Sequence, residues 1–201
     1  MNRIFSVDGQ VFRFLSAAYQ LLVLNLITLL FCLPIVTIFG SISAAFHVLF
    51  EIEEQQEVPV WQLFWQHFKA NLLVSSLINL YVFLVIGGLG VLIYVLGDTV
   101  ASFPLLLAMA FSLIVALTVA MTLGKEAGTL RELLNRSLVL DLKYTGFFAL
   151  AFSLFVIWFL VPIFLPRLGF LWFFFAFSLP MFISSKIYSY TLKHLTDKIQ
   201  E

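Results

Sequence analysis

Long apolar runs separated by short polar stretches dominate this chain. These runs extend over residues 14–33, 71–96, 103–123, 145–165 and 170–188, with a shorter one over 38–50. An α-helix rises about 1.5 Å per residue, so about 20 residues cross the roughly 30 Å hydrocarbon core of a bilayer. The pattern therefore predicts that each long run is a membrane-spanning helix.

The shorter run allows three arrangements. Pro34 ends the first long run, because the residue before a proline avoids the helical region and makes Leu33 a helix end or kink. The run over 38–50 then has about 13 residues, which is short for a full crossing. It can cross a thinned bilayer, form a re-entrant half-helix, or extend the first helix past a kink. We therefore predict an all-α, polytopic membrane helical bundle of five to six membrane helices, forming one domain over residues 1–201.

A first amphipathic helix precedes the run that begins at residue 71. Large aromatic residues recur at helical spacing on one face, followed by a lysine and an asparagine. They are Trp61, Phe64, Trp65 and Phe68, then Lys69 and Asn71. This pattern is typical of a helix that lies in the membrane interface. Two hypotheses follow: the aromatic face anchors the protein in the interface, or it forms the docking surface for a partner.

A second amphipathic helix is predicted before the run over 145–165. Thr129 and Glu132 have the spacing of a capping box, and leucines from Leu130 to Leu138 share one face. The order of interfacial helix, span, tight turn and returning span thus occurs over residues 61–123 and again over 130–188. This is a weak internal repeat, and any two membrane hairpins with basic residues at their cytoplasmic ends would share it.

Composition supports a membrane location. The chain is 62% hydrophobic and 11% charged, with a mean hydropathy of +1.07. A soluble domain is about 25% charged, so lipid is the solvent that fits this surface. The 11 basic and 11 acidic side chains cancel, which gives no indication of a nucleic-acid partner.

Basic residues set the expected orientation. They gather between the runs 103–123 and 145–165 and around the end of the run 170–188. These residues are Lys125, Arg131, Arg136, Lys143, Lys186, Lys193 and Lys198. The positive-inside rule makes these sides cytoplasmic, so the C-terminus is inside. With six crossings the N-terminus is also inside, and with five it is outside. Arg3 and Arg13 near the N-terminus favour six crossings and therefore a cytoplasmic N-terminus. A cleaved signal peptide is disfavoured, because the apolar stretch 21–39 is longer than the usual core of about 7–15 residues.

Catalytic and metal-binding patterns were not found. His47 and His67 form no zinc-binding motif, and Cys32, as the only cysteine, allows no disulfide within the chain. His67 is interpreted as a solvated headgroup contact and His47 as a hydrogen-bonded structural residue. We therefore predict no catalytic residue, no metal and no cofactor, and no enzymatic activity. The spans also lack acidic groups, which argues against a secondary transporter acting alone.

Uncharged polar residues occur inside the spans. They are Asn25, Ser75, Ser76, Asn79, Thr118 and Thr122. Such residues suit hydrogen bonds between helices, although they can equally line a narrow polar path. A candidate helix-break motif combines one of them with the residues around the first interruption: Asn25, Pro34, Thr37 and Gly40.

Two stretches within the first 71 residues resemble a known family. The first stretch comprises Asn25-Leu26, the segment 33–38 and a run of small residues from Gly40, and the second is the aromatic segment 64–71. Together they resemble the YesL-like family of bacterial membrane proteins. The family usually has glycine directly after the Thr-Ile pair, whereas Phe39 precedes Gly40 here. The resemblance implies a multi-pass plasma-membrane protein of unassigned activity that is accessory to carbohydrate ABC transport. Its expected partners are the lipid bilayer and transporter subunits, and the alternative function is a small-solute channel or facilitator.

Overall fold

The computed structural model describes residues 10–55, 57–97, 102–126 and 128–200. Throughout these residues the regular structure is helical, with no strand. The all-α membrane architecture predicted from the apolar runs is therefore confirmed.

The helix α2 lies at the centre of the fold. It covers Ile38–Gln55 and follows α1 (Gln10–Cys32) and a short 3-10 turn at Ile35–Thr37. Most of its side chains are buried, because it packs against α1, α4, α5, α9 and a short helix that follows it. Small residues such as Ser43 and Ala44 let these neighbours approach closely on several sides.

The remaining helices follow in chain order. They are α3 (Val60–Ala70), α4 (Leu72–Leu96), α5 (Ser102–Lys125), α6 (Leu130–Lys143), α7 (Thr145–Phe164), α8 (Gly169–Phe175) and α9 (Ser178–Gln200), with a 3-10 turn at Pro166–Leu168. The helix α4 ends at Gly97, which has a φ of 58°. Glycine adopts this left-handed conformation without steric cost, so it terminates the helix.

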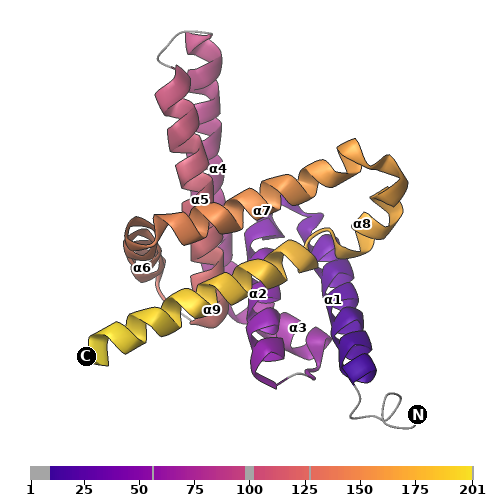
Figure 1. Ribbon diagram of the computed structural model, residues 1–201. Helices are drawn as coiled ribbons and strands as arrows, with labels where there is room; N and C mark the ends of the chain where they lie inside the picture. Colours follow the sequence, from indigo (N-terminus) through magenta and orange to yellow (C-terminus); the bar gives the residue numbers. More distant parts are fainter. Residues whose placement is uncertain (1–9, 56, 98–101, 127, 201) are drawn as a thin grey trace.

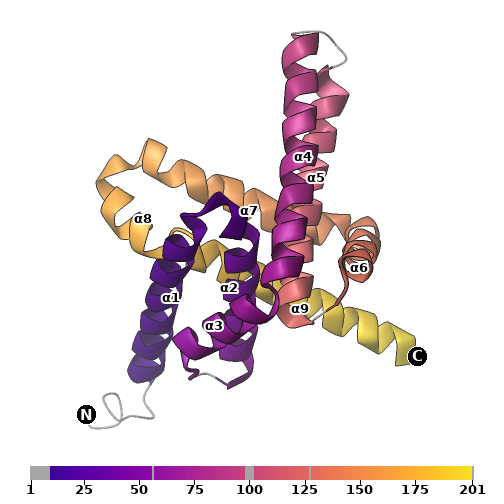
Figure 2. The ribbon, with the colours of Figure 1, turned by 180° about the vertical axis from the view of Figure 1, so that it is seen from behind.

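The hairpin of α4 and α5 projects from the rest of the molecule. Figures 1 and 2 show that its outer half extends beyond every other helix, whereas its base lies beside α2. Helices α7 and α9 lie side by side and cross the bundle at a steep angle to this hairpin in both views. The last part of the chain is therefore not a simple continuation of a parallel bundle.

Within the described residues, five helical segments are long and apolar enough to cross a membrane. They cover Arg13–Cys32, Ile35–Gln55, Leu72–Leu96, Ser102–Lys125 and Thr145–Phe164. The second, with 21 residues, corrects the expectation that the run over 38–50 is too short for a full crossing. The helix continues through Glu51 to Glu54, since glutamate is a good helix former and Ile52 remains buried.

The predicted sixth span over 170–188 is not one helix. It is broken between α8 and α9 at Ala176 and Phe177, and it is not among the five segments. Pro180 is not the cause of the break, because it lies in the first turn of α9, where its missing N–H costs no helical hydrogen bond. The break occurs earlier because a buried side chain from α1 binds the backbone there, as described below.

Gly124 allows a close contact between two helices of the core. A Cβ atom at Gly124 of α5 would lie 2.9 Å from the Ser43 carbonyl oxygen and 2.9 Å from the Phe46 Cβ. A methyl group does not fit at those distances, so the crossing of α2 and α5 depends on this glycine.

Candidate functional site

The aromatic face of α3 turns into the protein. Phe64 and Phe68 are 0% and 6% exposed, and their ring centroids lie 5.4 and 5.1 Å from that of Phe31 in α1. Trp65 also packs on Phe31, at 5.6 Å, whereas Trp61 is 51% exposed. The surface available to lipid or a partner is therefore centred on Trp61, and the two phenylalanines are part of the core.

Lys69 and Asn71 complete the predicted motif at the junction of α3 and α4. The Lys69 ammonium lies 4.5 Å from the centre of the Trp65 ring, which is within the range of a cation–π contact. Asn71 separates the two helices, and its amide nitrogen donates to the His67 carbonyl at 3.2 Å. Lys69 thus packs on its own helix, and Asn71 binds the last turn of α3.

Asn25 is completely buried and binds the break between α8 and α9. Its amide nitrogen donates to the Phe173 carbonyl at 2.9 Å. Its carbonyl oxygen accepts from the backbone N–H of Phe177 at 2.8 Å and of Ser178 at 3.4 Å. Backbone groups released by a helix break need such partners in an apolar environment. Asn25 therefore stabilises this break, although it lies about 150 residues away in the sequence.

The first interruption has its own polar partners. The Thr37 hydroxyl lies 2.7 Å from the Phe31 carbonyl and 2.9 Å from the Pro34 carbonyl. Asn79 of α4 donates to the Ile35 carbonyl at 2.9 Å. The interhelical hydrogen bonds predicted for polar span residues are thus present at both breaks: Asn79 binds the first from α4, and Asn25 binds the second from α1.

Gly40 lies at a second close approach. A Cβ atom there would lie 3.3 Å from the Phe68 ring and 3.3 Å from the Ser75 Cβ. The residue therefore serves the packing of α2 against α3 and α4. The four residues of the predicted helix-break motif are structural in this arrangement.

His47 and His67 stack on each other, which the sequence did not indicate. Their ring centroids are 4.4 Å apart at an interplanar angle of 19°. His47 Nδ1 lies 2.9 Å from the Gly124 carbonyl oxygen, as its predicted structural role requires. Burial, and then the neighbouring His47, lower the pKa of His67 to about 4, so its ring is neutral at pH 7 and is not the expected solvated headgroup contact.

A serine hydroxyl beside this pair has the spacing of a nucleophile and its base. Ser43 Oγ lies 3.3 Å from His67 Nε2. However, Ser43 is completely buried, and a nucleophile must be reached by its substrate. In the described residues, no three His, Cys, Asp or Glu side chains are grouped so that they could hold a metal ion.

A buried carboxylate is the feature that sequence reasoning missed. Asp141 of α6 is 0% exposed, and its Oδ1 accepts from the Thr118 hydroxyl of α5 at 2.7 Å. Its Oδ2 is also buried and has no hydrogen-bond partner. Burial raises the pKa of Asp141 to about 6, although the hydroxyl of Thr118 acts in the opposite direction.

The signal for this burial was present in the pattern. Leu130, Leu133, Ser137 and Asp141 recur at helical spacing on α6, and the last three are buried. Treating Asp141 as an ordinary polar residue of an interfacial helix hid it. Among the five described segments, acidic residues occur only at the end of the second, from Glu51 to Glu54, whereas α6 brings a further carboxylate against α5.

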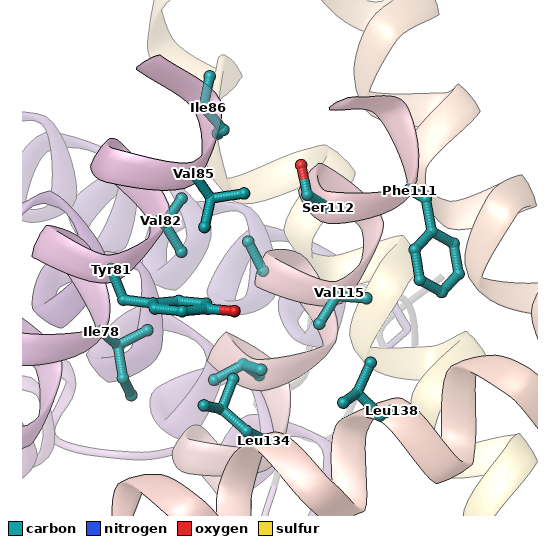
Figure 3. Close-up of a pocket in the computed structure, with 12 residues that line it drawn as sticks. Ile78, Tyr81, Val82, Val85, Ile86, Phe111, Ser112, Val115, Leu134 and Leu138 are labelled. Atoms are coloured by element: carbon teal, nitrogen blue, oxygen red, sulfur yellow. The ribbon is translucent and has the colours of Figure 1, made fainter. Parts of the chain in front are cut away.

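An apolar pocket lies between α4 and α5, with α6 below it. Its volume is about 210 Å³, and Figure 3 shows the Tyr81 ring lying across it above Leu134. Its other walls are valines, isoleucines and a phenylalanine, with Ser112 as a polar exception whose hydroxyl donates to the Met109 carbonyl. Sugars require several hydrogen-bonding groups, so this pocket suits a hydrocarbon chain or an apolar side chain.

Comparison with known proteins gives one match. Residues 21–95 match a family model described as "Protein of unknown function, DUF624". The matched segment runs from the second half of α1 to the end of α4, and it contains both predicted motifs but not Asp141. No curated protein and no solved structure matches the chain.

Proposed function

We propose that this protein is a non-enzymatic accessory component that associates with another integral membrane protein. The observation that carries the proposal is the projecting half of the α4–α5 hairpin (Figure 2). Its side chains have large exposed fractions, for example 88% at Tyr94 and 65% at Phe103. A protein whose spanning helices extend beyond its own core leaves surface for lipid or for the helices of a partner.

Exposed glycines on this hairpin support a helical partner. A Cβ atom added at Gly87, Gly88 or Gly90 would have no neighbouring atom within 4 Å. These glycines therefore serve no packing within the chain, and each costs about 1 kcal/mol relative to alanine inside a helix. Small residues on a membrane helix allow the backbone of a second helix to approach closely.

The identity of the partner rests on the family resemblance alone. Resemblance to the YesL-like family supports a component of a carbohydrate ABC transporter in the bacterial plasma membrane. The basic residues around α6 and α9 support an orientation with the C-terminus in the cytoplasm. The exposed Trp61 and Lys69 then lie at the cytoplasmic interface, where they contact lipid headgroups or the same partner.

The test is the variant Gly88→Leu, purified with its partners from native membranes in mild detergent. Leucine fits in the open space, so the variant is expected to fold with an unchanged or higher melting temperature and to lose the copurifying transporter component. Gly146→Leu on α7 is the matched control, because that glycine also has no neighbour within 4 Å. A Gly88→Leu protein that retains the partner at the wild-type level contradicts the proposal.

The rival function is a small-solute facilitator, which the buried hydroxyl groups around Asp141 favour. Purified protein in vesicles would then show saturable solute uptake without a partner. Uptake that is abolished by Asp141→Leu would favour this rival, and its absence for small sugars and amino acids would favour the accessory role.

A further inference from the structure

Asp141 is buried against α5, a helix long and apolar enough to cross a membrane. Its hydrogen-bond partner Thr118 precedes Lys125, the last residue of α5, by seven positions, which corresponds to about 10 Å along the helix axis. The carboxyl group is therefore enclosed by protein about two turns from the end of α5. A carboxylate without a partner charge is strongly disfavoured there.

The Thr118 hydroxyl contacts two acceptor oxygens but has only one hydrogen to donate. Its oxygen lies 2.7 Å from Asp141 Oδ1 and 3.1 Å from the Ile114 carbonyl oxygen. A hydroxyl has one hydrogen to donate, and a carboxylate and a carbonyl are both acceptors. If Asp141 carries the second proton, its O–H donates to Thr118, and Thr118 donates to Ile114, so both contacts are hydrogen bonds.

A second group of hydroxyls lies between α5, α6 and α9, beside an open cleft. Tyr188 of α9 donates to Thr122 Oγ1 at 3.2 Å, and Ser137 Oγ lies 3.2 Å from the same atom. Thr122 in turn donates to the Thr118 backbone carbonyl at 2.8 Å. Tyr188 also lines a cleft of about 430 Å³ between α6 and α9, together with Glu126 and Arg136.

The charged groups near Asp141 do not neutralise it. Arg136, on the same helix, forms a salt bridge with Glu126 at the end of α5. Lys143 lies over the ring of Tyr144, 5.7 Å from its centre. In the described part of the chain, Asp141 forms no salt bridge, and its Oδ2 has no donor. Neutralisation therefore requires a bound proton.

We propose that Asp141 is a proton-binding site, which exchanges its proton with water that enters the cleft between α6 and α9. The site binds the proton as a neutral carboxylic acid hydrogen-bonded to Thr118. It releases the proton as a carboxylate that accepts the hydroxyl of Thr118. This inference does not depend on the proposed partner, because it concerns a part of the chain outside the projecting hairpin.

The experiment is infrared difference spectroscopy of the purified protein in lipid vesicles, titrated from pH 4 to pH 9. The wild-type protein is expected to show a protonated-carboxyl carbonyl band that persists above pH 5 and disappears around pH 6. Asp141→Asn is expected to lack this band, since the amide keeps the shape but cannot ionise. Glu54→Gln, which removes an exposed carboxyl from α2, is the control and keeps the band.

A second variant keeps the proposal testable if Asp141→Asn does not fold. Thr118→Val removes the one donor to the carboxylate, so the ionised form is destabilised and the midpoint moves to higher pH. An unchanged midpoint in Thr118→Val overturns the proposal. So does a band above pH 5 that persists in Asp141→Asn, or a wild-type protein without any such band.

Discussion

Replacing Asn25 by leucine tests how the break between α8 and α9 is stabilised. The substitution removes the contacts with Phe173 at 2.9 Å and with Phe177 at 2.8 Å. Each buried backbone group that loses its partner costs about 1–3 kcal/mol. Leucine fills a similar volume, so cavity formation adds little. We therefore expect the free energy of unfolding to fall by about 2–6 kcal/mol.

The assay is denaturant unfolding of the purified protein in detergent micelles, with Asn79→Leu as the matched control. Asn79 donates one hydrogen bond, to Ile35, at a partly exposed site, so its loss is expected to cost about 1 kcal/mol. Amide exchange should accelerate around Phe177 in the Asn25 variant only. An Asn25→Leu protein as stable as the wild type would refute the assignment of Asn25 to this break.

Three further predictions concern the core. Gly124→Ala should lower the free energy of unfolding by about 1–3 kcal/mol through overpacking, whereas Gly87→Ala, measured by the same unfolding assay, should not lower it. Because the pKa of His67 falls from 6.5 unfolded to about 4 folded, stability should decrease as pH falls from about 6.5 to about 4; melting curves of His67→Gln should lack this contribution. Phe64→Ala should cost about 3–5 kcal/mol, but Trp61→Ala less than 1 kcal/mol in detergent; equal losses in melting experiments would show that both rings are core residues.

The bounds of α4 and α7 could be predicted from the sequence because the length of an apolar run is a local property. The ends of α4 at Leu96 and of α7 at Phe164 agree with the predictions to within one residue, and the helix break at Pro34 also follows from a local steric rule. The capping box was predicted in the same way, and the Thr129 N–H donates to Glu132 at 3.1 Å.

Contacts between distant helices could not be predicted in this way. The break at Phe177 depends on Asn25, and nothing in the local sequence 170–188 indicates it. The aromatic face of α3 has the pattern of an interfacial helix, but its phenylalanines are buried because Phe31 of α1 lies opposite them. Asp141 is a different case, because its helical spacing with Leu133 and Ser137 does mark the face of α6 that is buried.

The central claim is that the projecting α4–α5 hairpin binds another membrane protein. The most direct measurement places a photocrosslinking amino acid at position 88 and, in a separate variant, at position 146, and irradiates native membranes. The account predicts that position 88 yields an adduct with a transporter component, identified by mass spectrometry, and that position 146 does not. Adducts with lipid alone at position 88 would contradict it.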